Sequence, residues 1–132
     1  MLVVFRFVTP PVTGVQLQRR VEAIVGRKDY VVKKRYRPLE GISRHAPRAV
    51  VAAEDGRFWN HAGFDIEEMR IAGEEALSGK GMRGASTITQ QLVKNLFGCT
   101  CRNPIRKMYD FTLTPAAELI LGKRRIIELY LN

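Results

Sequence analysis

The sequence predicts a mainly α-helical protein built as one domain. Three observations support this expectation. Apolar residues recur at helical spacing through most of the chain, residues that begin helices precede several of these runs, and alternating strand-like patterns are rare. The chain has 132 residues, of which 45% are hydrophobic, and this length supports a single small core.

The first half of the chain contains two predicted helices joined by an extended arm. Residues 15–27 have the apolar spacing of a short amphipathic helix that ends near Gly26. The stretch "DYVVKKRYRPL" indicates a strand or an extended arm, which Pro38 ends. Residues 46–54 are mostly small and apolar, which predicts a buried helix.

Two helix starts can be recognised in the second half. Asp65 and Glu68 have the spacing of an N-cap pair, and the helix they begin is followed by the glycine-rich loop "SGKGMRG". In "GASTITQQLVKNLF", Thr87 and Gln90 have the same spacing, and the apolar residues after them predict a helix that ends before Gly98.

A last helix is expected to begin at Asn103-Pro104 and to run toward the end of the chain. Pro115 is expected to kink or end it, and Gly122 to interrupt or weaken it. Because the apolar periodicity is still present at Asn132, we expect the C-terminal helices of the fold to be missing.

Residues 1–14 form a region of their own before the domain predicted for residues 15–132. They are apolar, but Arg6 and Pro10-Pro11 make them too short for a complete transmembrane helix, which needs about 20 residues. They fit either the end of a membrane anchor or an N-terminal arm that is extended or β and packs on the core.

Charge and cysteine content restrict the classes of function. The chain has 22 Lys+Arg against 13 Asp+Glu, a formal net charge of +9, which favours an anionic partner such as a phosphate-bearing ligand, nucleic acid or an acidic membrane. Cys99 and Cys101 are poorly spaced for a disulfide or a zinc site. We therefore expect no metal site from these cysteines with His45 or His61.

The densest candidate for chemistry is "AEDGRFWNHAGFD". Here Glu54 and Asp55 precede Phe58 and Trp59, and aromatic neighbours can tune a carboxylate to act as a general acid or base. The alternative is a solvated helix end with Phe58 in the core.

Two further segments could bind an anion. The helix start at residues 84–97 offers hydroxyl and amide donors beside unpaired backbone N–H groups, although plain N-capping explains two of them. Arg102, Arg106 and Lys107 near Asp110 could clamp a diphosphate, or could form a salt-bridged surface. A base, a donor-rich helix start and a basic cluster are what group transfer from a diphosphate donor requires.

A competing interpretation takes residues 84–131 as a helix-turn-helix DNA-binding module.

Four blocks of sequence resemble the first four motifs of the peptidoglycan glycosyltransferase family, most closely its monofunctional, membrane-anchored biosynthetic members. The blocks are "AEDGRFWNHAGFD", "RGASTITQQLVKNLF", "RKMYD" and "KRRIIELYLN", in this order. The resemblance implies a lysozyme-like fold that polymerises lipid II at the outer, periplasmic face of the cytoplasmic membrane. It also implies inversion at the anomeric carbon and release of undecaprenyl diphosphate.

The resemblance further implies the partners and the site residues. Lipid II, the growing glycan strand and the membrane surface are expected partners, other cell wall synthesis or division proteins are compatible with it, and nucleic acid is not expected. No tightly bound cofactor is implied, although a divalent cation such as magnesium often assists this family. Glu54 corresponds to the general base and Asp110 to the second catalytic carboxylate. The expected substrate contacts are Asp55, Phe58, His61, Arg83, Ser86, Thr87, Thr89, Gln90, Gln91, Lys94, Asn95, Arg106 and Lys107.

Three departures from the family pattern affect these expectations. Asp110 stands where the family has glutamate, so its carboxylate is one methylene shorter. Pro115 enters a stretch that is usually one helix and is expected to tilt Asp110 or Glu118. The chain stops at the fourth motif, so an inactive fragment of such an enzyme remains an alternative.

Overall fold

The computed structural model describes residues 1–31, 34–81, 84–98 and 104–132, with side chains from residue 108 onward in the last range. The described residues are helical and contain no strand. No helix among them is long and apolar enough to cross a bilayer. The elements are α1 (Leu2–Phe7), α2 (Gly14–Val25), η1 (Leu39–Gly41), α3 (His45–Glu54), η2 (Phe58–Asn60), α4 (Ile66–Leu77), α5 (Ile88–Phe97) and α6 (Pro104–Tyr130).

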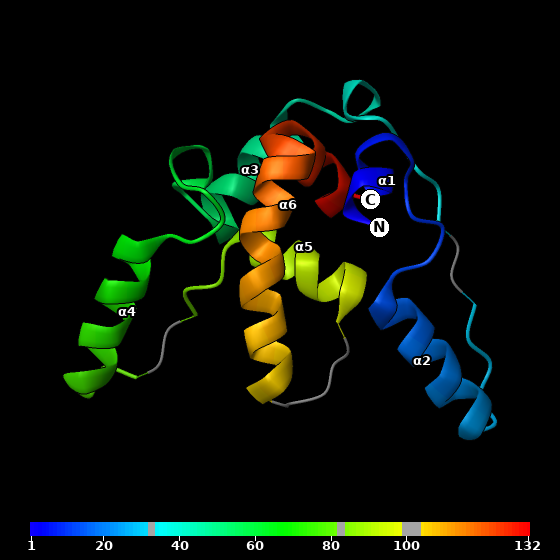
Figure 1. Cartoon of the computed structure of the whole chain (residues 1–132), viewed down its shortest axis with the longest axis horizontal. Helices are drawn as coiled ribbons and strands as arrows, with labels where there is room; N and C mark the ends of the chain where they lie inside the picture. Colours follow the sequence, from blue (N-terminus) through cyan, green and yellow to red (C-terminus); the bar gives the residue numbers. More distant parts are fainter. Residues whose placement is uncertain (32–33, 82–83, 99–103) are drawn as a thin grey trace.

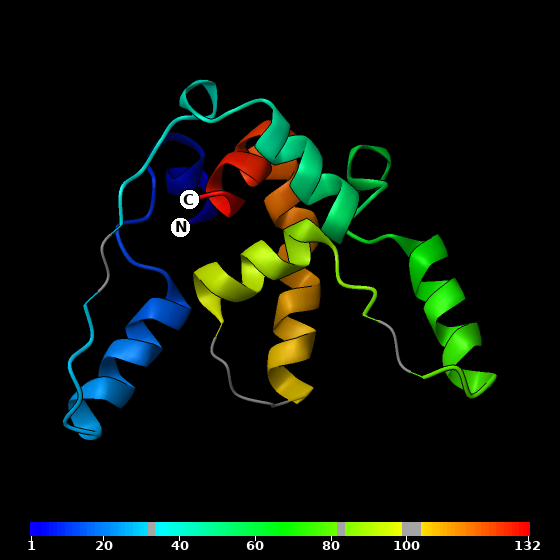
Figure 2. The same ribbon diagram turned by 180° about the vertical axis from the view of Figure 1, so that it is seen from behind.

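The core forms where α5 packs on α6. These two helices make the most extensive contact between elements, α1 packs on α6, and α2 touches α5. Figures 1 and 2 show α6 in the middle of the molecule with α2 and α4 projecting on opposite sides. The largest fully buried apolar side chains come from η2, α5 and the end of α6: Phe58, Ile88, Val93, Ile126 and Ile127.

The predicted starts of α4 and α5 are confirmed, because each is set by local hydrogen bonds, whereas Asn103, the predicted cap of the last helix, lies outside the described residues. The Asp65 side chain accepts the N–H of Glu68 at the start of α4. At the start of α5, the Thr87 side chain accepts the N–H of Gln90, and the Gln90 side chain accepts the N–H of Thr87. These caps satisfy N–H groups that have no partner inside the helix.

α6 changes direction at Gly122 and not at Pro115, so the expectation that Pro115 would kink or end the helix is wrong. The non-helical residue is Gly122, with φ 74° and ψ 158°, whereas Pro115 lies within the helix. Proline removes one hydrogen bond, but its own φ is helical. A positive φ with an extended ψ is accessible almost only to glycine, which explains why the break falls at Gly122.

The N-terminal segment is helical, which corrects the predicted extended or β structure. Leu2–Phe7 form α1, and the helix is held by packing: the rings of Phe5 and Phe97 stack with their centroids 5.7 Å apart. The Arg125 side chain on α6 also donates from Nε to the carbonyl oxygen of Phe5 at 2.9 Å. The later arm at residues 28–38 forms no strand where it is described.

Two helices are less buried than their sequences suggest. α3 was predicted to be buried, yet Val51 is its one buried side chain. On α4 the one buried residue is Ala72, while Ile66 and Leu77 are 70% and 91% exposed. Helical spacing defines an apolar face, but it does not say whether another element covers that face.

We predict that Gly122→Ala lowers the free energy of unfolding by about 1–3 kcal/mol, because alanine is strained at this φ and ψ. An added Cβ would meet nothing within 4 Å, so the effect would come from the backbone alone. Gly73→Ala is the matched control, since Gly73 lies inside α4 with the same open surroundings, and it should raise stability by about 0.5–1 kcal/mol. Urea unfolding measures both, and equal effects would contradict the backbone explanation.

Candidate functional site

A cavity of 430 Å³ lies between the end of α3 and the start of α5. Glu54, the last residue of α3, and Ser86, just before α5, both line it and are both exposed. The chain therefore brings together the candidate base and the donor-rich helix start. The wall consists of Ala52, Ala53, Glu54, Asp55, Gly56, Asp65, Glu68, Gly84, Ala85, Ser86 and Thr87.

Asp55 joins the loop after α3 to the start of α5. Its carboxylate is buried, and Oδ2 accepts the backbone N–H of Ile88 at 3.0 Å. Oδ1 lies 2.8 Å from Nε2 of His61. Nδ1 of His61 accepts the N–H of Gly63 at 3.1 Å, so the imidazole proton is on Nε2 and is donated to Asp55.

Asp55 is therefore an anion of the protein's own at the start of α5, and the binding of a further anion there stays a prediction. The Ile88 N–H is taken by Asp55, and the Gln90 N–H by Thr87. Thr87 also donates its hydroxyl to the carbonyl oxygen of Gly63 at 2.6 Å. These bonds fasten the segment between α3 and α4 to α5.

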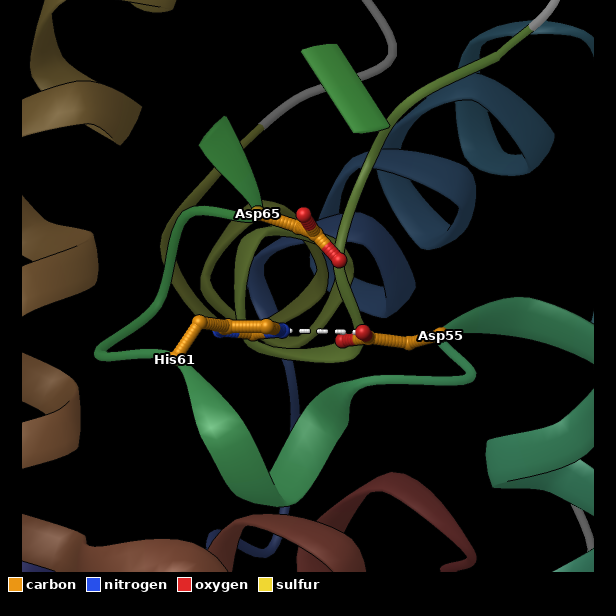
Figure 3. Close-up of side chains that lie close together, drawn as sticks. All are labelled: Asp55, His61 and Asp65. Carbon is orange, nitrogen blue, oxygen red and sulfur yellow. Dashed lines mark hydrogen bonds and ion pairs between the residues drawn. The ribbon is translucent and has the colours of Figure 1, made fainter. Parts of the chain in front are cut away.

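Asp65 completes this cluster (Figure 3). Arg57 donates from Nε to Asp65 Oδ2 at 2.9 Å, and a second guanidinium nitrogen pairs with Oδ1. The hydrogen bond from Arg57 lowers the pKa of Asp65 from 3.8 to about 2, against the opposing effect of burial. Each of Asp55, His61 and Asp65 has a ligand-type atom, and these atoms lie within 4.8 Å of one another. Protein groups already form hydrogen bonds with these atoms, so the cluster stabilises the loop between α3 and α4.

Glu54 has a hydrogen-bonding partner on α5, which has its own partner on α6. Gln91 donates from Nε2 to Oε2 of Glu54 at 3.0 Å. The Tyr130 hydroxyl donates to Oε1 of Gln91 at 2.8 Å. Burial, together with the charge of Glu54, raises the pKa of Tyr130. Three elements thus contribute to the surroundings of one carboxylate.

A second polar cluster lies inside the molecule beneath η2. Thr89 donates its hydroxyl to Oε1 of Glu118 at 2.5 Å, and Lys123 donates to the same oxygen at 2.7 Å. The Lys123 ammonium also lies 4.2 Å from the centroid of the Phe58 ring. Phe58 and Thr89 are fully buried and contact protein groups here, and their predicted contact with substrate stays a prediction.

Lys94, Asn95 and Asp110 are not among the residues that line the 430 Å³ cavity. Lys94 and Asn95 are exposed on α5, and Asn95 lines a separate cavity of 290 Å³ together with Tyr130. Asp110 is partly buried on α6, and its carbonyl oxygen accepts the hydroxyl of Thr114. The side chains of Arg83, Arg106 and Lys107 lie outside the described residues.

Sequence reasoning assigned no role to Glu118, Lys123 or Tyr130. The structure places Glu118 and Lys123 in the cluster with Thr89, and Tyr130 beside Gln91. Two of them belong to "KRRIIELYLN", which was recognised as a motif without assigning a role to any of its residues. A polar residue within an apolar helical run was the available signal for Glu118.

Comparisons with known proteins show the family of the chain. The family model for transglycosylase matches residues 19–132. Biosynthetic peptidoglycan transglycosylases from Caulobacter vibrioides and Chromohalobacter salexigens are 41% and 43% identical, over 99% and 100% of this chain and 55% and 56% of their own lengths. That of Shewanella frigidimarina is 43% identical over 96% of this chain and 52% of its own. The chain thus spans about half the length of these relatives, and they do not favour the DNA-binding interpretation.

We expect acid to weaken the contribution of Asp65 to stability. Its carboxyl has a lower pKa folded, about 2, than the usual 3.8, so the unfolded chain binds more protons between these values. The stabilisation is complete above about pH 4 and is lost as the pH falls through about 2. Asp65→Asn keeps an N-cap for α4 and removes the charge. The difference in unfolding free energy between wild type and Asp65→Asn should therefore shrink with acidification, and a constant difference would contradict the Arg57–Asp65 pairing.

Proposed function

The chain belongs to the transglycosylase family, and we propose that the protein polymerises lipid II into the glycan strands of peptidoglycan. The observation that carries this proposal is the position of Glu54. Its exposed carboxylate lies on the wall of a cavity shared with Ser86 and accepts a hydrogen bond from Gln91. A carboxylate held at the edge of an open cavity can reach a sugar hydroxyl.

Glu54 removes the proton from the acceptor sugar hydroxyl in the proposed reaction. The oxygen then forms a bond to the anomeric carbon of the growing strand on the face opposite the leaving group. The bond from that carbon to the diphosphate oxygen breaks, and its electron pair leaves with undecaprenyl diphosphate. The anomeric carbon is inverted, and the proton remains on Glu54.

The two aspartates of the cavity wall are less suited to this role. Asp55 is buried and accepts hydrogen bonds from His61 and Ile88. Asp65 is buried and paired with Arg57. A general base must reach substrate and accept a proton, and both of these carboxylates are held by protein donors. Glu54 therefore remains the best candidate among the first-motif acids.

Charge on the departing diphosphate needs cations nearby. Lys94 is exposed on α5, three residues beyond Gln91, and we propose that it contributes together with Arg106 and Lys107. Asp110 supplies carboxylate oxygen, which suits a divalent cation such as magnesium. When bound, that cation would neutralise charge on the diphosphate.

We also propose that the enzyme works on a membrane surface, with this domain on the periplasmic face of the cytoplasmic membrane. The far ends of α2 and α4 and the first turns of α6 lie on the same side of the molecule in both views (Figures 1 and 2). Each carries exposed apolar side chains: Ile24 and Val25 on α2, Leu77 on α4, and Met108, Tyr109 and Phe111 on α6. Exposed Arg27, Lys28 and Lys80 adjoin them, as expected for contact with an anionic lipid surface.

Glu54→Gln should lower the rate of lipid II polymerisation by about 10²–10⁴-fold, because glutamine cannot accept the proton. The full-length protein would be assayed with lipid II in detergent or vesicles, following product length on gels. Glu40→Gln is the control, since Glu40 is exposed and pairs with Arg124 instead of lining the cavity. Equal rates for wild type and Glu54→Gln would remove Glu54 as the base.

Leu77→Ser should weaken binding to vesicles that contain anionic lipid by about tenfold, since it removes apolar area from the end of α4. Ile66→Ser is the matched control on the same helix, because Ile66 is also exposed but lies at the other end. Its effect should stay within about twofold. Sedimentation with vesicles measures both, and equal losses would contradict the proposed orientation.

A further inference from the structure

We propose that Tyr130 is a positioning residue for Glu54 and that it acts through the side-chain amide of Gln91. The inference rests on the proposed function, because it concerns the carboxylate proposed as the general base. It assigns a role in catalysis to the end of α6, which does not line the cavity beside Glu54.

The three side chains form a line of two hydrogen bonds. Tyr130 OH donates to Gln91 Oε1 at 2.8 Å, and Gln91 Nε2 donates to Glu54 Oε2 at 3.0 Å. Gln91 and Tyr130 are absent from the cavity wall that contains Glu54. Gln91 is partly buried and Tyr130 lines a separate cavity, so both act on the carboxylate from outside the cavity that Glu54 lines.

The direction of these bonds follows from the chemistry of the amide. A carboxylate only accepts hydrogen bonds, so Gln91 must present its NH₂ group to Glu54. If the amide were turned over, its oxygen would face the carboxylate oxygen, and two acceptors would repel each other. A donor at the other end of the amide selects the useful orientation, and the Tyr130 hydroxyl is that donor.

The hydroxyl is protonated at neutral pH, and its surroundings disfavour ionisation further. Partial burial and the negative charge of Glu54 raise the pKa of Tyr130 above its usual value of 10.0. The phenol therefore keeps its proton at the pH at which the enzyme would work.

The protein anchors both Tyr130 and Gln91. The ring of Tyr130 packs against the hydrophobic core, and this packing fixes the position of its hydroxyl. The backbone of Gln91 lies in the first turns of α5 and donates its N–H to Thr87 at 3.0 Å. The start of that helix is held by Asp55. Movement of the Gln91 amide is thus restricted to rotation of its own side chain.

The consequence for catalysis is a fixed carboxylate. Glu54 is exposed, and a glutamate at a helix end has several rotamers of similar energy. The bond from Gln91 selects one of them, and misplacement of a catalytic group by about 1 Å can cost on the order of a hundredfold in rate. Loss of the Tyr130 hydroxyl should reduce the turnover of bound substrate more than the binding of substrate.

The first test is Tyr130→Phe in the full-length protein, which keeps the ring in the core and removes the hydroxyl. We expect kcat for lipid II polymerisation to fall about tenfold while KM stays within about twofold. Tyr36→Phe is the matched control, because it removes a hydroxyl that donates to Glu128 at 2.7 Å, away from Glu54. Its kcat should equal that of wild type. A wild-type kcat for Tyr130→Phe would overturn the proposal.

A double-mutant cycle then separates positioning from an independent effect of Tyr130. Because Tyr130 acts through Gln91, the variant that combines Tyr130→Phe with Gln91→Ala should be no slower than Gln91→Ala alone. If the two substitutions instead lowered kcat independently, so that their fold-losses multiplied in the double variant, the proposed action of Tyr130 through Gln91 would be overturned. Glu54 would still be the proposed base. Adding Tyr130→Phe to Glu54→Gln should likewise change nothing further. If Glu54→Gln alone were fully active, the base assignment would fail, and the positioning role would fail with it.

Discussion

The buried carboxylate of Asp55 is the contact on which the candidate site depends. A buried charge costs several kcal/mol unless hydrogen bonds replace the water it has lost. Here the imidazole of His61 and the first N–H of α5 supply those bonds, and the positive end of the helix dipole adds to them. Glu54, the candidate base, directly precedes Asp55 in the chain. The hydrogen bonds of Asp55 therefore also restrict the backbone position of Glu54 at the end of α3.

The end of α6 joins the arm at residues 28–38 to the rest of the fold, and the change of direction at Gly122 makes these contacts possible. After Gly122 the last part of α6 turns toward α1 (Figure 1) and reaches the arm at residues 28–38. Glu128 accepts hydrogen bonds from Tyr36 and from the N–H of Leu39. Asn132 exchanges two hydrogen bonds with the backbone of Arg37, at 2.7 and 2.9 Å. The fourth sequence block, "KRRIIELYLN", thus binds the arm at residues 28–38 through Glu128 and Asn132. It also contacts Gln91 through Tyr130.

Much of the fold could be predicted from local sequence. The starts of α4 and α5 were predicted because capping depends on residues three positions apart, and the hydrophobic face of α5 was predicted because Ile88, Leu92 and Leu96 follow helical spacing. The N-terminal helix was not predicted. α1 has only 6 residues, a length at which local preference is weak, and its structure depends on packing of Phe5 on Phe97 and on Arg125.

The sequence by itself determined the family motifs, the helix starts and the identity of Glu54 as the leading candidate base, since each depends on residue type and short spacing. Only the tertiary structure decided that Asp55 occupies the start of α5, that Phe58 and Thr89 are core residues, and that Tyr130 reaches Glu54 through Gln91. The physical reason is separation along the chain. These hydrogen bonds join residues more than 30 positions apart, and no local pattern specifies which donor will meet which acceptor.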